Sequence, residues 1–206
     1  RLVAPPGHFT VHTSAEVMTT EFVDQAPGAP YIDVQSLPDA VLSYLLPSRY
    51  CESESFNQMA TEITAGQLLG YDQVAAIQDW LRRTISYQPG SSDNPISAIE
   101  VNRRGSGVCR DLSHLGIALC RSLSIPARMV VGYHYELVPM DMHAWFEAFV
   151  GGRWYTFDAT QSRLTGGYVA IGFGRDAADV AVFNQFGPSV YPTMQKVSVE
   201  RIEEED

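Results

Sequence analysis

The sequence predicts an α+β fold in which helices come first and an antiparallel sheet follows. This prediction rests on three observations. Apolar residues recur with helical spacing between residues 38 and 125, whereas polar and apolar residues alternate from residue 128 onward. The Gly151–Gly152 pair between two of the alternating segments is typical of a tight hairpin, which joins antiparallel strands. Helices followed by strands indicate an α+β domain.

Composition excludes several classes of protein. The 206 residues are 45% hydrophobic, enough for a sizeable core, and carry a net charge of −10. An acidic chain without a basic patch is unsuited to nucleic acid. No apolar stretch approaches the roughly 20 residues of a membrane-spanning helix. Three cysteines and no visible signal segment favour, weakly, a cytoplasmic location, although the native N-terminus is expected to precede Arg1.

The first 35 residues differ from the rest. Residues 9–22 are rich in β-branched and aromatic residues and predict a strand, and residues 25–35 form a linker rich in Pro and Gly. We therefore divide the chain into a strand and linker at 1–35 and a core at 36–206.

Two short helices are expected next. The first begins near Pro38, after Ser36 or Leu37, and ends before Pro47. The second covers residues 56–65, with Ser53 or Ser55 as its N-cap.

A third helix has the clearest pattern of these. Asp72 is expected to cap it, and its apolar face consists of Val74, Ile77, Leu81 and Ile85. Residues 88–95 then form a loop, and a fourth helix follows Gly107 and stops at Pro126.

Four segments read as strands, because polar and apolar residues alternate along them. They are residues 128–136, 143–150, 153–160 and 191–204, the last ending in a solvated acidic tail. Residues 172–175, with the sequence GFGR, are interpreted as a loop because a dinucleotide-binding motif would need a third glycine.

Cys109 is the candidate nucleophile. It falls in the first turn of its helix, where unpaired N–H groups and the helix dipole favour a thiolate over a thiol. Gly105 and Gly107 leave space for a substrate carbonyl, and the N–H of Cys109 could serve as an oxyanion donor. A core position or a metal ligand are the alternatives, but no zinc-like spacing of ligands accompanies this cysteine.

The hairpin selects the partners of Cys109. With Gly151–Gly152 as the loop, Val150 faces Arg153 and Trp145 faces Asp158. His143 is then a diagonal neighbour of Asp158, within side-chain reach provided that the register does not slip. The sequence therefore predicts a triad of Cys109, His143 and Asp158.

Several sequence segments resemble the transglutaminase-like core, which has a circularly permuted papain-like fold. They are LPSRYC (46–51), GVCRD (107–111), SLSIPAR (122–128), VVGYHY (130–135), HAWFEAFVGGRWYTFDAT (143–160) and IGFGRDAADVA (171–181). The similarity extends over residues 36–190, chiefly to bacterial proteins often labelled putative cysteine proteases. It implies the same three catalytic residues, a cysteine nucleophile at Cys109, a histidine at His143 and an aspartate at Asp158. It also implies that residues 1–35 end a truncated β-rich domain.

The chain departs from the animal transglutaminases in two respects. Those enzymes use an upstream tryptophan as an oxyanion donor, and this chain has none in its place. The candidates to replace it are Tyr87, Ser91, Ser92 and Asn94, of which Tyr87 is preferred. There is also no calcium-binding loop, so we expect no metal and no cofactor. Trp145 and Arg175 are further candidates for substrate contact.

The remaining polar and sulfur-containing residues near the motif are interpreted as structural. Cys120 and Cys51 are expected in the core or a connection, and His114 is expected to pack. Arg110 and Asp111 are expected to be exposed charges of the first helical turn.

The sequence thus predicts a cysteine-dependent peptidase, amidase or transglutaminase-type acyltransferase that acts on protein or peptide amides through a thioester. Hydrolysis and transfer stay open, because the triad does not select water or amine as the acceptor. The alternatives are a silent papain-like scaffold that binds proteins or peptides, and a redox sensor based on Cys109.

Overall fold

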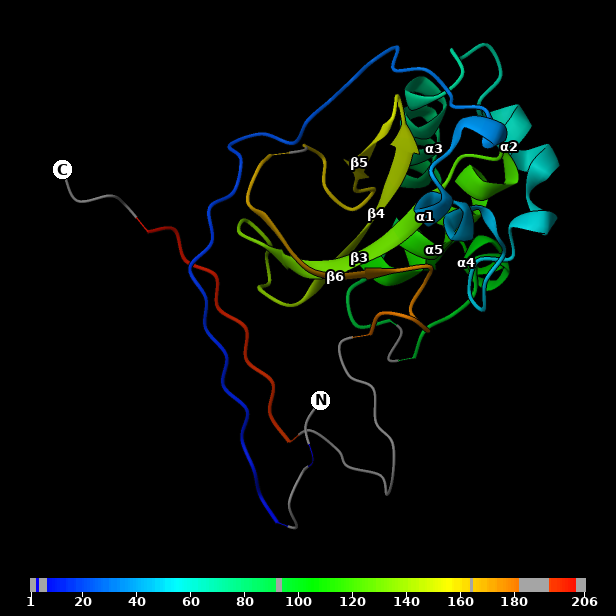
Figure 1. The fold of residues 1–206 in the computed structure, drawn as a ribbon. Helices are drawn as coiled ribbons and strands as arrows, with labels where there is room; N and C mark the ends of the chain where they lie inside the picture. The colour runs from blue at the N-terminus through cyan, green and yellow to red at the C-terminus, as the bar shows by residue number, and fades with distance from the viewer. Residues whose placement is uncertain (1–2, 4–6, 92–93, 164, 182–192, 203–206) are drawn as a thin grey trace.

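The protein consists of a four-stranded antiparallel sheet with helices packed against one face (Figure 1). The computed structural model describes residues 3, 7–91, 94–163, 165–181 and 193–202. The α+β prediction is confirmed: the helices precede the sheet, whose strands follow in the order β5-β4-β3-β6. The sheet strands are β3 (Ala127–His134), β4 (His143–Val150), β5 (Arg153–Phe157) and β6 (Tyr168–Gly174).

The helical layer contains five α-helices and three short 3-10 turns among the described residues. These elements are η1 (Val34–Ser36), α1 (Asp39–Leu42), η2 (Ser43–Leu45), η3 (Ser53–Ser55), α2 (Asn57–Ile63), α3 (Tyr71–Thr84), α4 (Ala98–Arg104) and α5 (Cys109–Ser122). Two very short strands, β1 (Ser86–Tyr87) and β2 (Ser106–Gly107), pair in parallel between α3 and α5.

Helix α5 occupies the centre of the molecule, between the other helices and the sheet. It packs so tightly on β4 that a Cβ added at Gly116 would lie 2.7 Å from the Phe146 ring. Phe146 in turn stacks on Phe157 of β5, and Ile77 of α3 and Leu115 belong to the same buried cluster. This close packing holds the N-terminus of α5 at a defined place against the sheet.

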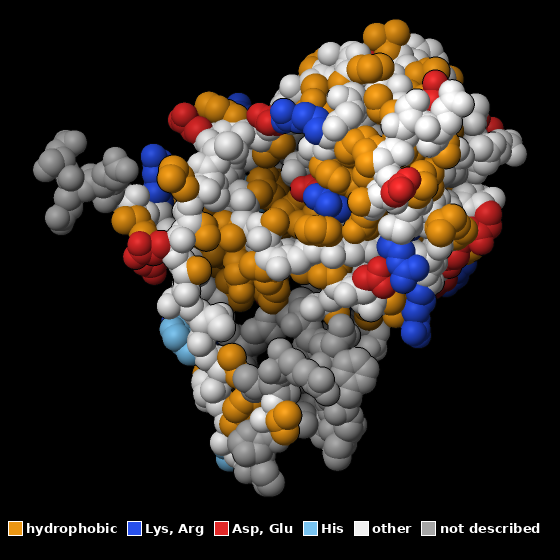
Figure 2. Space-filling model, in the orientation of Figure 1, with side chains coloured by type: hydrophobic (Ala, Val, Ile, Leu, Met, Phe, Trp, Pro, Cys, Tyr) orange, Lys and Arg blue, Asp and Glu red, His pale blue; other side chains and the backbone are white. Residues whose placement is uncertain are grey.

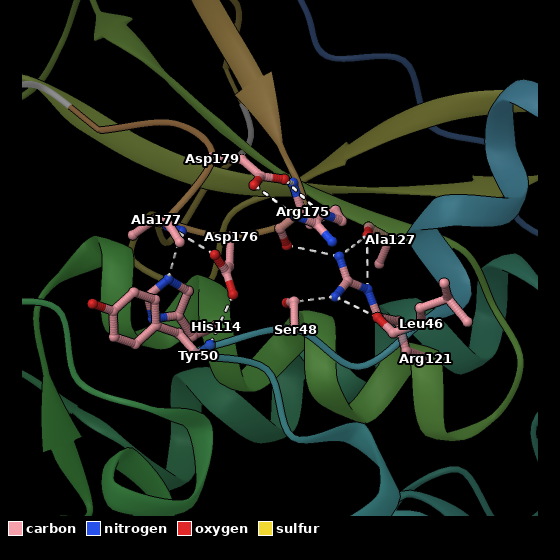
Figure 3. Close-up of polar contacts among 11 residues, drawn as sticks. Leu46, Ser48, Tyr50, His114, Arg121, Ala127, Arg175, Asp176, Ala177 and Asp179 are labelled. Atoms are coloured by element: carbon pink, nitrogen blue, oxygen red, sulfur yellow. Dashed lines mark hydrogen bonds and ion pairs between the residues drawn. The ribbon is translucent and has the colours of Figure 1, made fainter. Parts of the chain in front are cut away.

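A buried polar network ties α5 to three other segments (Figure 3). The guanidinium of Arg121 donates to the carbonyl oxygens of Leu46, Ala127 and Arg175 and to the hydroxyl of Ser48. Arg121 is 4% exposed. One side chain thus satisfies backbone groups from the loop after η2, the start of β3 and the end of β6.

Two further buried side chains, His114 and Asp176, lie beside this network (Figure 3). The carboxylate of buried Asp176 accepts from the backbone N–H groups of Tyr50 and Ala178. His114 lies between the carbonyl of Ile96 and the N–H of Ala177, and Tyr50 stacks on its ring. His114 therefore packs as a structural residue, as predicted.

Most expected helices are present, but their caps differ. Helix α3 begins after Gly70, and Asp72 lies inside its first turn, where it accepts from the N–H of Gly28. Ser53 and Ser55 do not cap α2, because both lie in η3 and Phe56 precedes the helix. Helix α4, which the sequence analysis assigned to no element, is capped by the Ser97 hydroxyl.

The predicted terminal strands are wrong where the structure describes them. Residues 9–22 form no strand, and only Phe22 makes an isolated bridge, to Thr165. Residues 193–202 likewise form no strand, and the rest of the predicted segment 191–204 lies outside the described residues. An alternating pattern yields a strand only where a partner backbone is available, and no strand of the described residues pairs with either segment.

The interpretation of residues 172–175 as a loop is also wrong. Residues 172–174 belong to β6, an edge strand that pairs with β3. A Cβ added at Gly132 of β3 would lie 1.9 Å from the carbonyl oxygen of Val169. This absence of a side chain allows β6 to approach β3 closely at the irregularity between Val131 and Gly132.

Candidate active site

Cys109 is the first residue of α5, and a short parallel pairing positions it. Gly107 in β2 lies opposite Tyr87 in β1, and Val108 precedes the helix. Gly107 must be small, because an added Cβ would lie 2.8 Å from the Cβ of Asp111. Cys109 is partly exposed, whereas Cys51 and Cys120 are fully buried, as predicted. Of the three cysteines, Cys109 alone lies at a helix N-terminus and within reach of solvent.

Asp111 is fully buried, which corrects the prediction of an exposed charge. Its carboxylate accepts from the N–H of Val108 and pairs with the Arg110 guanidinium at 3.1 Å. Arg110 also donates to the carbonyl of Asn94. Asp111 therefore closes the first turn of α5 and links it to the preceding loop, as a capping residue does.

The hairpin has the predicted register. Gly151 and Gly152, both with positive φ, form the turn, and Val150 pairs with Arg153. His143 begins β4 and Asp158 follows β5, so both lie at the same end of the sheet. His143 Nε2 lies 2.6 Å from Asp158 Oδ2, and both side chains are buried. The two predicted partners of the thiol do meet.

Asp158 is held on both sides of its carboxylate. Oδ1 accepts from the N–H and the hydroxyl of Thr160, and Oδ2 accepts from Tyr168 as well as from His143. Burial alone would raise the pKa of Asp158, but the hydrogen bonds from His143 and Thr160 and the charge of His143 lower it. Asp158 thus stays ionised despite being buried.

The second nitrogen of His143, Nδ1, is not used by Asp158. It is buried and makes no hydrogen bond of normal geometry to the described residues. Burial alone would lower the pKa of His143, but hydrogen bonding to Asp158 and Cys109 and the negative charge of both raise it to about 10. Since Nε2 is bound to Asp158, Nδ1 is the nitrogen left for Cys109. The site can therefore hold an imidazolium beside the thiol.

The backbone of Asp158 is fixed by α3. Its N–H donates to Gln78 Oε1 at 3.0 Å, and its carbonyl accepts from Arg82 at 3.2 Å. Sequence analysis missed Gln78, Arg82, Thr160 and Tyr168. Thr160 had a local signal, since Asp and Thr two residues apart often form such a turn, but the others come from distant elements.

The described residues contain no group of three or more His, Cys, Asp or Glu side chains arranged to hold a metal ion. No helix in the described part of the chain is both long and apolar enough to cross a membrane.

Comparison with known proteins identifies the family of this chain. The sequence pattern of the transglutaminase-like superfamily matches residues 57–159, half of the chain. The chain belongs to this superfamily. Cys109, His143 and Asp158 all lie within the matched residues, in the order that the superfamily resemblance implied.

Three individual proteins are also similar to this chain. A putative cysteine protease from Cytophaga hutchinsonii is 44% identical, with a TM-score of 0.70, over 75% of this chain and 53% of that one. The present chain therefore spans about half the length of that protein. An uncharacterized protein of Mycobacterium leprae (strain TN) is 29% identical over 191 residues, which are 87% of this chain and 68% of that protein. The periplasmic domain of TgpA from Pseudomonas aeruginosa is 23% identical, with a TM-score of 0.48, over 61% of this chain and 48% of that one.

The other predicted site residues of this superfamily member fall in different places. Tyr87 of β1 lies opposite Gly107, two residues before Cys109. Burial and the charges of Cys109, Asp158 and Asp141 raise the pKa of Tyr87 to about 12. Trp145 is buried on the same face of β4 as His143, with ring centres 6.0 Å apart. Ser92 lies outside the described residues.

Arg175 is not brought to the triad. It follows Gly174, which pairs with Met129, whereas His143 pairs with Gly132 toward the other end of β3. Arg175 forms an ion pair with Asp179 and borders the Arg121 network (Figure 3). Nearby, β6 exposes Ile171 and Phe173, and Figure 2 shows hydrophobic side chains gathered over the sheet in the centre of the view.

Proposed function

We propose that the protein is a cysteine-dependent acyl-transfer enzyme that acts on amide bonds of a protein or peptide. The observation that carries the proposal is the arrangement of His143, bound through Nε2 to Asp158 and left with Nδ1 for Cys109 at the start of α5. A nucleophile, a base and a group that orients the base are the parts that covalent acyl transfer needs.

The first half of the reaction forms a thioester. The Cys109 sulfur attacks the amide carbon, and the C–N bond breaks as the nitrogen takes the proton from the His143 imidazolium. Asp158 stays ionised, keeps the ring oriented and stabilises its charged form. The amine leaves, and the acyl group is joined to sulfur.

The second half releases the acyl group. Neutral His143 removes a proton from water or from an amine, which attacks the thioester carbon and expels the Cys109 thiolate. Water yields a carboxylic acid, as in a peptidase or amidase, and an amine yields a new amide, as in a transglutaminase. The thiolate and imidazolium are then restored.

In this proposal two groups stabilise the oxyanion. The N–H of Cys109 points out of the first turn of α5. The Tyr87 hydroxyl, whose pKa is raised to about 12, stays protonated and serves as the second donor. Tyr87 belongs to β1, whose pairing with β2 places it across from the residues that lead into Cys109.

Mass spectrometry of a trapped thioester tests this function. The protein is mixed with a glutamine peptide, an ordinary peptide and a small amide, then quenched in acid before digestion. We expect an acyl adduct on Cys109 with one substrate class, with no adduct in Cys109→Ser and an undiminished adduct in Cys120→Ala. Absence of an adduct with all three classes would contradict the proposal.

A further inference from the structure

Tyr168 reaches the same carboxylate oxygen as the candidate catalytic histidine. It is the first residue of β6, and its hydroxyl donates to Asp158 Oδ2 at 2.9 Å. His143 Nε2 lies 2.6 Å from that same oxygen. The next strand along the chain, which lies beside β3 and not beside β5 in the sheet, therefore completes the surroundings of Asp158.

The ring of Tyr168 is held from two sides. His134, its partner on β3, packs against it with ring centres 4.3 Å apart, and Trp145 meets it edge-on at 5.0 Å. The close approach of β6 to β3 at Gly132 sets the position of the strand that carries the ring. The packing of the ring thus fixes the direction of the hydroxyl toward Asp158.

Among the described residues, the other donors to Asp158 bind atoms other than Oδ2, apart from His143. Thr160 serves the opposite oxygen, Oδ1, and Arg82 binds the backbone carbonyl of Asp158. His134 makes no hydrogen bond to Asp158, and neither of its ring nitrogens makes a hydrogen bond of normal geometry to the described residues. Removing the hydroxyl would therefore leave Oδ2 with His143 alone.

We propose that Tyr168 is a positioning residue of the acyl-transfer centre, which fixes Asp158 against His143 and limits how strongly the carboxylate attracts the imidazole proton. This role rests on the proposed function of the triad. A carboxylate oxygen that accepts two hydrogen bonds is a weaker acceptor for each than an oxygen that accepts one. Burial and the charge of Asp158 raise the pKa of Tyr168, so the hydroxyl stays a donor.

Other charged groups face the site, and a test of Tyr168 must leave all of them unaltered. Cys109 and Asp158 act on His143, Arg82 of α3 acts on Tyr168, and Glu136 acts on His134. Replacing the hydroxyl alone alters none of these groups. Tyr168→Phe does so, because it keeps the ring that packs on His134 and Trp145.

The test is the titration midpoint of His143, measured by NMR of its ring in the full chain. We expect Tyr168→Phe to raise the midpoint by about half a unit or more, because Oδ2 then binds the imidazolium more strongly. Incorporation of 3-fluorotyrosine at position 168, a more acidic and stronger donor, should lower it. Tyr155→Phe is the control and should leave the midpoint of His143 unchanged. Tyr155 is a buried tyrosine of β5 that packs on Tyr71 of α3.

The opposite signs of the two substitutions separate this role from simple packing. A midpoint that stays within about 0.1 unit in both proteins, or that moves the same way in both, would overturn the proposal. The 3-fluorotyrosine protein keeps the whole side chain, so it gives a result even if Tyr168→Phe does not fold. The readout needs no substrate, so failure to trap a thioester would refute the proposed function without deciding the role of Tyr168.

Discussion

His143 Nε2 and Asp158 Oδ2 lie 2.6 Å apart where β4 begins and β5 has just ended, and neither side chain reaches solvent. A carboxylate in that position would be costly without partners, yet it receives hydrogen bonds from His143, Thr160 and Tyr168. The pair is therefore a charged unit inside the protein, and its charge state governs the thiol beside it.

Asp158→Asn should slow the reaction of Cys109 with iodoacetamide at pH 6 by about tenfold or more. The neutral amide no longer raises the pKa of His143, and each unit lost makes the imidazolium about tenfold less favoured. At this pH an ordinary free thiol is almost wholly protonated, so fast alkylation reports the charged pair. The rate is measured by peptide mass spectrometry.

Asp179→Asn is the matched control for that substitution. Asp179 is also a paired aspartate, but its partner is Arg175 and it lies away from the triad. Burial raises the pKa of the Cys51 and Cys120 thiols, so both should stay unlabelled in all proteins. Wild-type Cys109 reacting no faster than glutathione at pH 6 would show that no charged pair exists.

Stability should fall as pH rises from 7 to 10, because of His143. Its pKa is about 10 in the folded protein and near 6.5 in an unfolded chain, so the folded state holds the extra proton in this window. The stabilisation is complete below pH 6.5 and is lost through pH 10, with a slope of up to about 1.4 kcal/mol per pH unit. Urea unfolding at several pH values measures it.

His143→Gln should remove most of that alkaline slope while the other titrating groups are unchanged. The substitution also leaves Asp158 with one donor fewer, so the variant should be less stable than wild type at pH 7. Parallel stability curves for the two proteins between pH 7 and 10 would contradict the raised pKa.

Acid should destabilise the protein through two other histidines. Burial lowers the pKa of His114 and of His134, and the charge of His143 lowers that of His134 further. Their folded values lie below 6.5, so the unfolded chain binds more protons as pH falls below that value, and stability decreases. For His114 the cause is visible: protonated Nε2 would meet the N–H of Ala177, two donors facing each other.

His134→Phe tests the second of these groups. The substituted ring can keep the packing on Tyr168, and it removes two buried nitrogens that make no hydrogen bond of normal geometry. We expect stability at pH 7 to be unchanged or slightly higher, and the loss of stability between pH 7 and 5 to be smaller than in wild type. An identical loss in the variant would exclude His134 as a source of acid sensitivity.

The parts of the site that the sequence predicted are those with local signals. The Gly–Gly turn set the register of β4 and β5, and that register brought His143 to Asp158. The glycines and the apolar period around Cys109 likewise indicated the start of α5. Each of these signals lies within a few residues of the feature that it predicts.

The parts that the sequence analysis missed depend on contacts between distant segments. Tyr168 reaches Asp158 only because β6 pairs with β3. The glycine-rich sequence at the end of β6 was interpreted as a loop. The burial of Asp111 follows from the space left by Gly107, which no residue pattern shows. The strand predicted at residues 9–22 has the right composition but no neighbouring strand in the structure.

Arg121→Met should destabilise the fold by about 3–5 kcal/mol, because several buried acceptors lose their donor at about 1–3 kcal/mol each. The guanidinium is the shared donor for the carbonyls of Leu46, Ala127 and Arg175 (Figure 3), and methionine would leave these groups with fewer donors in a site closed to water. The measurement is the urea midpoint at pH 7.

Arg103→Met provides the control, because Arg103 is an arginine of α4 whose side chain is 71% exposed. Its ion pair with Glu100 lies at the surface, so its loss should change stability far less than the loss of Arg121. At a low temperature where Arg121→Met is folded, iodoacetamide should still alkylate its Cys109 at the wild-type rate, since Arg121 lies at the opposite end of α5. A loss of alkylation without a loss of stability would instead make Arg121 part of the reactive centre.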